Sequence, residues 1–320
     1  MSVKVFITID TEEDNWGDYA VESAVENITQ LPVLQALLNK YGAVPTYMVN
    51  YPVVTSTSSV RILSSILEKG QCEIGAHCHP WNTPPYTEKL DSYHSMMCNL
   101  PDDLLMDKLS NLHQAIKSNC GVTPVSFRAG RWGLNENVAQ CIMELGYKID
   151  TSISPFVDWS VNHGPNFMGA NTRPYKFNSD NIFKHIPNGQ LIEIPATIGF
   201  LQQNFELHGA IYSLLKKPFF SKLHLLGILA RLRLLNFHWL SPEVSSGEEM
   251  VLLAKRFVKS GHTFLNMSFH STCMLPGKSP FVNSEKDLKE FLGRIEIFLK
   301  YAVENDFEFL PLSESEKYCC

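Results

Sequence analysis

Several features that mark particular classes of protein are missing from this 320-residue sequence. No segment approaches 18 uncharged apolar residues, so we expect no transmembrane helix. The apolar run at residues 3–9 leads directly into acidic residues and has no small-residue cleavage site, which predicts a first strand and not a secretory signal. Lys and Arg number 27 against 33 Asp and Glu, and a net charge of −6 disfavours nucleic acid as the main partner.

The eight cysteines also lack the compact spacing of a disulfide framework. In a chain of this length without a secretory signal, that pattern predicts reduced thiols and a cytoplasmic protein. Hydrophobic residues make up 44% of the chain and charged residues 19%, which is ordinary for a globular protein with a sizeable core.

Short apolar, β-branched runs alternate with longer amphipathic stretches along the chain. The predicted strands are residues 3–10, 44–49, 72–77, 125–128, 147–152, 191–197, 263–270 and 307–312. The predicted helices are residues 21–41, 60–69, 102–119, 135–145, 248–259 and 285–305. Alternation of this kind predicts parallel strands joined by helical crossovers. Seven or eight such units fit a distorted (β/α)7-type barrel of the α/β class, forming a single domain over residues 1–320.

Two segments break this rhythm and are interpreted as insertions within the one domain. Residues 156–189 are rich in Asn, Pro and Gly, which is typical of a long loop. Residues 207–240 are rich in Leu and aromatic side chains and contain no Asp or Glu. Their basic residues are Lys216, Lys217, Lys222, Arg231 and Arg233. This second insertion is either a helical cover packed on the barrel or a shallow attachment to an anionic surface, such as the inner face of a membrane.

Reactive residues fall at the ends of several predicted strands. They are Asp10, His77, His79, Arg128, Asp150 and His270. In a barrel of parallel strands the carboxyl ends open on one face, and that face carries the active site. The architecture therefore brings together residues that are 260 positions apart in the sequence.

His77 and His79 are one residue apart on an extended segment, so their side chains project to the same side. Neutral imidazoles are good ligands for zinc and similar cations, although two ordinary histidines in a polar loop would look the same. If the first strand stays extended beyond its end, Asp10 and Glu12 both face the barrel mouth, while Thr11 and Glu13 face away. Glu12 is then the preferred third ligand.

Asp14 is the second choice for that ligand, because it shares the parity of Glu12 but follows a predicted turn. The acidic run could equally be a solvated loop or a helix N-cap. Arg128 is either half of a surface ion pair or the group that orients the acid at the end of the first strand. A lone histidine such as His270 is more often structural, unless an acid such as Asp150 holds one ring nitrogen.

Taken in order, these elements resemble the five motifs of the polysaccharide deacetylases of carbohydrate esterase family 4, which include chitin and peptidoglycan deacetylases. The matching residues are Thr8 to Glu12, Gly75 to Pro80, Arg128 to Trp132, Asp150 with Asp158 and Trp159, and Leu265 with His270. Two departures stand out. Thr11 occupies the position of the second adjacent acid, and the histidine pair is separated by one residue where the family has three. The compact His-x-His-Pro-Trp form resembles a divergent bacterial branch associated with capsule and lipopolysaccharide gene clusters.

The resemblance implies a metal-dependent N-deacetylase that acts on N-acetylated sugars. It implies Zn²⁺ or another divalent transition metal, held by His77, His79 and one acid. It further implies the following roles: Asp10 as general base, Arg128 orienting Asp10, His270 as general acid oriented by Asp150, Leu265 lining the acetyl pocket, and Trp81, Trp132 and Trp159 offering flat faces to sugar rings. Two rival functions remain open, namely a catalytically inert barrel that binds glycans and a hydrolase of another non-peptide C–N bond.

Overall fold

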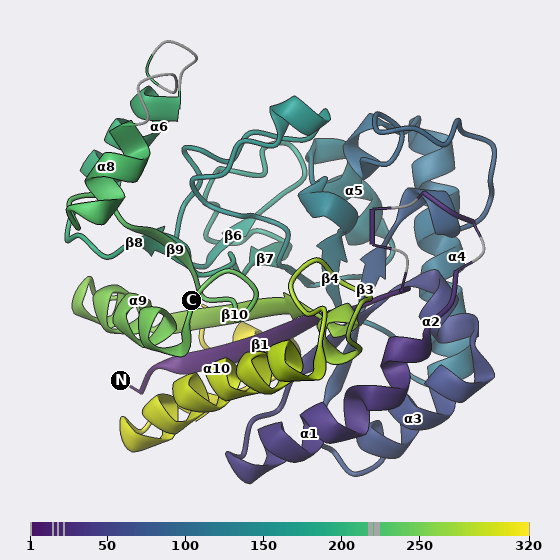
Figure 1. Ribbon diagram of the computed structural model, residues 1–320. Helices are drawn as coiled ribbons and strands as arrows, with labels where there is room; N and C mark the ends of the chain where they lie inside the picture. Colours follow the sequence, from purple (N-terminus) through teal and green to yellow (C-terminus); the bar gives the residue numbers. More distant parts are fainter. Residues whose placement is uncertain are drawn as a thin grey trace.

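The computed structural model describes residues 2–14, 16–17, 19–21, 23–216, 220 and 225–319. In this part of the chain the central feature is a curled, nine-stranded sheet (Figure 1). Its order is β10 (Phe264–His270), β1 (Lys4–Thr11), β2 (Thr46–Val49), β3 (Glu73–Cys78), β4 (Ser126–Ala129), β5 (Ile149–Asp150), β7 (Leu191–Glu193) and β6 (Tyr175–Phe177), with β11 (Glu308–Phe309) also pairing with β1. All pairs are parallel except β6 with β7.

Helices cover the outside of this sheet (Figure 1). They are α1 (Leu31–Lys40), α2 (Tyr51–Thr55), α3 (Thr57–Leu67), α4 (Asp102–Cys120), α5 (Glu136–Glu144), α9 (Gly247–Lys259) and α10 (Glu285–Glu304). Side-chain caps fix several of their first residues, as in the capping box of Ser246 and Glu249 at the start of α9. The predicted α/β class and distorted (β/α) barrel are confirmed. The predicted helix at 21–41 is divided into a 3-10 helix, η1 (Glu26–Gln30), followed by α1.

Strand parity separates an outer core from a filled interior. Val5, Ile7 and Ile9 of β1 belong to the large cluster that packs against the helices. The alternate residue Phe6 instead meets Met48, Ile149, Ile192 and Leu312 inside the barrel. An apolar plug therefore closes the amino-terminal end of the barrel interior, and the polar residues of β1 lie above it.

The gap between β7 and β10 is closed by single backbone hydrogen bonds and not by a full ladder. Thr197 N donates to Asn266 O at 3.1 Å, and Leu240 N donates to Thr197 O at 2.8 Å. Ser268 N in turn donates to Leu240 O at 3.1 Å. The barrel is therefore not closed by a continuous ladder between β7 and β10, which is a distortion of the regular barrel.

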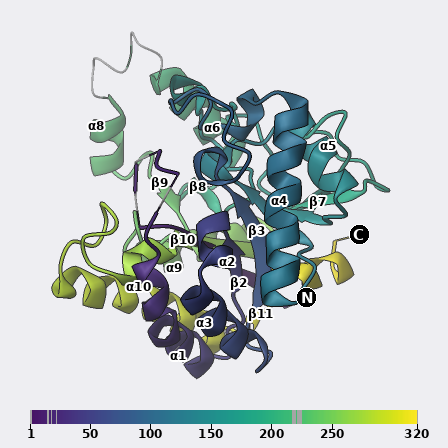
Figure 2. The ribbon, with the colours of Figure 1, turned by 90° about the vertical axis from the view of Figure 1, so that its right-hand side faces the viewer.

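The predicted basic insertion stands on a separate two-stranded sheet. β8 (Ile198–Phe200) pairs antiparallel with β9 (Phe237–Trp239), and the helices α6 (Phe205–Lys216) and α8 (Leu225–Arg231) lie between them in the sequence. Both views show α8 standing clear of the barrel (Figures 1 and 2). Lys217 and Lys222 lie outside the described residues. No helix in the described part of the chain is long and apolar enough to cross a bilayer.

Candidate functional site

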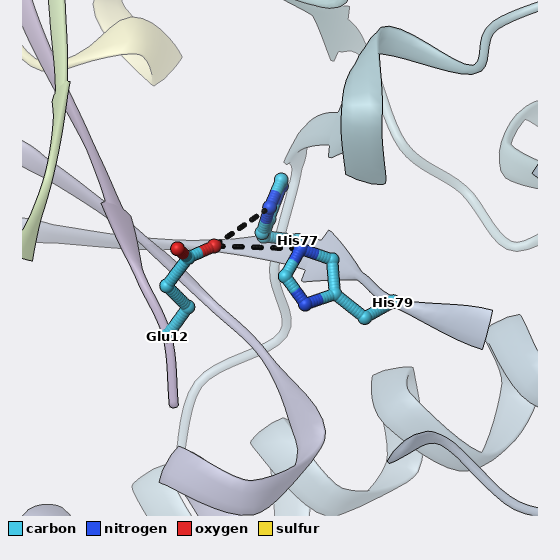
Figure 3. A group of neighbouring side chains, drawn as sticks. All are labelled: Glu12, His77 and His79. Atoms are coloured by element: carbon cyan, nitrogen blue, oxygen red, sulfur yellow. Dashed lines mark ion pairs between the residues drawn. The ribbon is translucent and has the colours of Figure 1, made fainter. Parts of the chain in front are cut away.

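Glu12, His77 and His79 form a compact, buried group at the carboxyl ends of β1 and β3 (Figure 3). Glu12 Oε2 lies 3.6 Å from His77 Nε2 and 3.4 Å from His79 Nε2. A tetrahedral ion with bonds of about 2.0–2.2 Å holds its ligand atoms roughly 3.3–3.6 Å apart. These three side chains therefore have the donor types and the spacing to hold a metal ion such as Zn²⁺. Burial raises the pKa of Glu12 to about 8, and a cation placed between these atoms would oppose that shift.

The second nitrogen of each imidazole is already occupied by an acceptor. His77 Nδ1 lies 3.1 Å from the backbone oxygen of Arg128, and His79 Nδ1 lies 3.1 Å from Glu13 Oε1. Because both partners accept hydrogen bonds, each Nδ1 carries the proton and each Nε2 keeps its lone pair. Burial lowers the pKa of His77, which keeps that ring neutral as a ligand must be. Such outer contacts fix the tautomer and orientation of metal-binding histidines.

Glu13 belongs to this site, although strand parity predicted that it would face away. β1 ends at Thr11, so the chain bends before Glu12 and both glutamates reach the mouth. Besides His79, Glu13 accepts hydrogen bonds from Trp81 Nε1 at 3.1 Å and from Asn50 Nδ2. Burial alone would raise the pKa of Glu13, but the interaction with His79 and the hydrogen bond from Asn50 lower it to about 2.

Asp14, the second choice as metal ligand, lies apart from the triad. Its carboxylate accepts from the backbone nitrogens of Glu26 and Asn27 at 3.0 and 3.1 Å, at the start of η1. It also forms an ion pair with Lys278 at 3.3 Å. Asp14 therefore acts as a helix-capping residue, and the group that can hold a metal contains Glu12 and not Asp14.

Asp10 faces the barrel interior and forms a buried ion pair with Arg128. Arg128 Nη1 donates to Asp10 Oδ1 at 2.5 Å, and Nη2 donates to Thr8 Oγ1 at 2.6 Å. The guanidinium is also fixed by Nε, which donates to the backbone oxygen of Thr151 at 3.0 Å. Burial alone would raise the pKa of Asp10, but the charge of Arg128, with smaller effects of His77 and His270, lowers it to about 2. Asp10 is thus ionised at neutral pH.

His270 lies on the other side of Asp10, because β1 and β10 run in register with these two residues paired. His270 Nε2 is 3.6 Å from Asp10 Oδ2, and its Nδ1 is 2.8 Å from Glu243 Oε1. Burial would lower the pKa of His270, but the charges of Glu243, Glu12 and Asp10 raise it to about 10. The imidazole is therefore held as a cation between two acids.

The predicted contact between Asp150 and His270 is not formed, and Glu243 takes that place. Asp150 accepts from Ser152 N at 3.0 Å and from Ser152 Oγ at 2.7 Å, and it lies opposite Glu193 in the register of β5 and β7. Its neighbour Ile149 is the residue that points into the barrel, so Asp150 points to the opposite face of the sheet. The parity of this two-residue strand could not be read from its short apolar pattern.

A cavity of about 440 Å³ opens above these groups. Its walls are largely aromatic and include Trp16, Tyr19, Trp81, Trp132, Trp159 and Trp239. The three predicted tryptophans thus line the cavity, and Trp81 also stacks on His79 with ring centroids 4.1 Å apart. Leu265 does not line the cavity. It is fully buried on the helix-facing side of β10, because its odd parity matches that of Val5.

The loop after β4 reaches the cavity through unusual backbone geometry. A Cβ on Gly130 would lie 2.3 Å from the backbone oxygen of Cys78 and 2.6 Å from His79 Cδ2, so only glycine allows this close approach to the histidine pair. The next two residues, Arg131 and Trp132, have positive φ angles of 53° and 62°. Strained residues of this kind gather at functional sites, and here they turn both side chains into the cavity wall.

Sequence reasoning missed three features of this site, which are Glu243, Trp239 and the inward position of Glu13. Trp239 lies at the end of the basic insertion and Glu243 follows it, in a segment without strong periodicity, so no pattern assigned them to the mouth. A weaker signal was available for Glu13, since three acids in a run of four at a strand end exceed what one helix cap requires.

Comparisons with known proteins agree with the fold. No protein-family model matches the sequence, and no curated protein matches it. A predicted polysaccharide deacetylase from Mycobacterium smegmatis has a similar structure, with a TM-score of 0.54 and 14% identity over 98% of this chain and 89% of that chain. A family 4 carbohydrate esterase from Streptomyces lividans, in complex with acetate, has a TM-score of 0.45 and 12% identity over 96% of this chain and 91% of that chain.

A 4-alpha-glucanotransferase from Thermococcus litoralis is also similar, with a TM-score of 0.53 and 11% identity. The match covers 100% of this chain but only 41% of the glucanotransferase. The likeness to the Mycobacterium smegmatis protein confirms that the fold resembles that of a polysaccharide deacetylase. Because a glucanotransferase shares the same fold, function has to be argued from the side chains of the site.

Proposed function

We propose that this protein is a metal-dependent hydrolase that removes acetyl groups from N-acetylated sugars. The observation that carries the proposal is the meeting of one triad and two pairs of groups at one mouth of a deacetylase-like barrel. A buried triad of metal-ligand type lies beside an ionised acid held by Arg128 and a cationic imidazole held by Glu243. Amide hydrolysis needs this combination, because it must activate a water, stabilise an oxyanion and protonate a poor leaving group.

Glu12, His77 and His79 would hold Zn²⁺ or another divalent transition metal. When bound, such a cation lowers the pKa of water and polarises a carbonyl oxygen. The donor set of one carboxylate and two imidazoles leaves a position open for water, as in other catalytic sites with three protein ligands. Glu13 and Trp81 orient His79, and the backbone oxygen of Arg128 orients His77.

Asp10 and His270 would share the proton transfers of the reaction. Asp10 is ionised and accepts the proton of the attacking water, while Arg128 holds its carboxylate in place. His270 is protonated and donates a proton to the nitrogen of the departing amine, which breaks the C–N bond and releases acetate. Glu243 keeps the His270 ring oriented and charged until that step.

The cavity supports a sugar as the substrate. Flat aromatic side chains surround an opening large enough for a sugar ring, and they lie directly above the reactive groups. The likeness in fold to a polysaccharide deacetylase supports the same class of substrate. Zinc as the metal, a cytoplasmic location and a role in capsule or lipopolysaccharide synthesis remain predictions.

The proposal is tested by metal analysis together with an acetate-release screen. Purified protein should contain about one equivalent of Zn²⁺, or take up Co²⁺ or Ni²⁺ in its place. It should release acetate from polymeric, nucleotide-linked or lipid-linked N-acetylated sugars, and His270→Ala should lose most of this activity while keeping its metal. Release from small cyclic amides alone would favour another C–N hydrolase. Tight glycan binding without turnover by metal-loaded protein would favour an inert barrel.

A further inference from the structure

The α6–α8 hairpin concentrates exposed aliphatic side chains in a short part of the chain. In the described residues, twelve Leu, Ile or Val side chains are exposed. Five lie on this hairpin, namely Leu207, Leu214, Ile228, Leu232 and Leu234, and are 45–62% exposed. Scattered single residues of this kind are normal on a surface, but five within 28 positions of one hairpin, called the aliphatic patch below, are a concentration of the kind found at interaction sites.

These side chains are not needed to hold the hairpin together. The inner face of the hairpin has its own core, in which Leu215 and Leu235 pack against Phe156 and Phe200. Gly209 lets α6 approach closely, since a Cβ there would lie 2.7 Å from the ring of Phe156. The hairpin is therefore already packed on its stem, and its outer aliphatic side chains are left for another partner.

The outer side chains follow helical spacing. Leu207 and Leu214 are seven positions apart on α6. Leu232, directly after the end of α8, is four positions from Ile228 and continues the helical turn by donating its backbone N–H to Ile228 O at 3.0 Å. Positions with these separations lie on the same side of a helix. Leu234 follows in the turn after α8 and is 57% exposed. The patch thus consists of two helical stripes and one turn residue.

Cations outnumber acids at the aliphatic patch, since Glu206 in the first turn of α6 is the one acid on α6 and α8 in the part of these helices that the structure describes. Lys216, Arg231 and Arg233 are exposed, and no Asp or Glu occurs between residues 207 and 240. The whole chain carries a net charge of −6, so this local excess of positive charge is not a property of the composition. Aliphatic side chains next to basic ones match the boundary between acyl chains and anionic headgroups.

The position of the hairpin links it to the cavity. α6 and α8 stand on β8 and β9, and Trp239 of β9 lines the cavity wall beside Trp132, with ring centroids 5.9 Å apart. Figures 1 and 2 both show α8 projecting beyond the barrel. The short strand β9 therefore connects the hairpin, and any flat surface that the hairpin contacts, to the cavity wall.

We propose that the α6–α8 hairpin docks the protein on the surface of a bilayer that contains anionic lipid. A second copy of the chain is a poorer partner, because a symmetric dimer through this patch would bring like charges together. An anionic bilayer satisfies both the aliphatic and the basic side chains. The proposal concerns binding alone and does not depend on the deacetylase activity.

The test is flotation of the full chain with sugar-free vesicles. We expect binding to phosphatidylglycerol–phosphatidylcholine vesicles at low salt, weaker binding at high salt, and little binding to phosphatidylcholine alone. Arg231→Gln with Arg233→Gln should weaken binding to the anionic vesicles about 30-fold, from about 5-fold for each charge near the surface. The matched control is Lys286→Gln with Lys300→Gln, which removes two exposed cations from α10 and should change nothing.

A second pair of variants tests the aliphatic part. Leu232→Asn with Leu234→Asn should lower binding to anionic vesicles, whereas Leu252→Asn, at a 50% exposed leucine of α9, should not. Absence of binding by the wild type at low salt, or equal binding by hairpin and control variants, would overturn the proposal. So would a dimer in sedimentation that only the hairpin variants dissociate. All variants should release acetate from soluble substrates alike, so failure of the docking proposal and failure of the proposed function are distinguishable.

Discussion

Asp10 and Asp150 are both buried acids near the carboxyl ends of parallel strands in the same sheet, yet their pKa values move in opposite directions. Burial acts to raise the pKa of each. For Asp10 the charge of Arg128 outweighs burial and lowers the pKa to about 2. For Asp150 burial prevails and raises the pKa, although hydrogen bonds from Glu193 and Ser152 act to lower it.

The difference shows which face of the sheet can do chemistry. Inside the barrel each acid is matched by a cation or an imidazole, as Asp10 is by Arg128 and Glu13 by His79. These two acids have lowered pKa values and are charged at neutral pH, so Asp10 can accept a proton. On the helix-facing side Asp150 and Glu193 are closed off from the cavity and have only each other as acidic partners. That pair keeps a proton and serves the structure.

The largest expected effect is on catalysis, and it separates Asp10 from the pair of Asp150 and Glu193. Asp10→Asn removes the group that accepts the proton of water and should lower kcat by about 10²-fold or more, with metal content and folding kept. The control is Glu193→Gln, which changes a buried carboxyl group of the opposite face and should leave kcat close to that of the wild type. Steady-state acetate release decides the matter, and a large loss in both variants would remove the distinction between the two faces.

The next largest effect is on metal affinity, and it tests which of the three acids after β1 is the metal ligand. Glu12→Gln should lose most of the metal, because it removes a ligand atom of the triad. Glu13→Gln should weaken metal binding roughly 10- to 100-fold, since it only orients His79. Asp14→Asn loses one of the two backbone hydrogen bonds at η1 but removes no ligand atom of the triad, so it should bind metal as the wild type does. Competition with a chelator measures all three, and a stronger effect of Asp14→Asn than of Glu12→Gln would contradict the geometry.

The pH dependence of the rate distinguishes Glu243 from Asp150 as the partner of His270. The charge of Glu243 raises the pKa of His270, so Glu243→Gln should lower that pKa. Because the reaction needs protonated His270, the alkaline limb of the kcat profile should move to lower pH. Asp150→Asn should leave this limb in place, since its carboxyl group bonds to Ser152. A shift in Asp150→Asn alone would restore the pairing expected from the sequence.

The sequence was sufficient for the alternation of strands and helices and for placing the histidine pair and Asp10 at strand ends, because each depends on a long periodic pattern or on residues close together in the sequence. β1 and β10 are eight and seven residues long, and their in-register pairing brings His270 to Asp10 as expected. Asp150 was misplaced because β5 has only two residues, too few to fix which side chain faces inward. Leu265 was assigned from family spacing, whereas its strand parity turns it outward.

The residues missed altogether share a different cause. Glu243 lies in a loop, and nothing local in the sequence sets the position of a loop side chain relative to a strand end 27 residues away. Glu13 was assigned outward on the assumption of an extended chain, but β1 ends at Thr11. In both cases tertiary contacts, to His270 and to His79, decide the orientation.

The smallest expected effect is on stability, and it tests the pair of Asp150 and Glu193 directly. Glu193 has an ordinary pKa near 4.5 when the chain is unfolded, and burial with the nearby Asp150 raises its pKa well above that value in the folded state. Above pH 4.5 the folded protein therefore keeps a proton that the unfolded chain releases. The free energy of unfolding falls as pH rises, by at most about 1.4 kcal/mol per pH unit for one proton.

Glu193→Gln carries no such proton but can still donate a hydrogen bond to Asp150. Urea unfolding between pH 5 and 9 should show the variant gaining on the wild type as pH rises, whereas the exposed-site control Glu290→Gln should follow the wild-type curve. Parallel curves for Glu193→Gln and the wild type would mean that Glu193 is ionised in the fold, and the contrast between the two faces of the sheet would not hold.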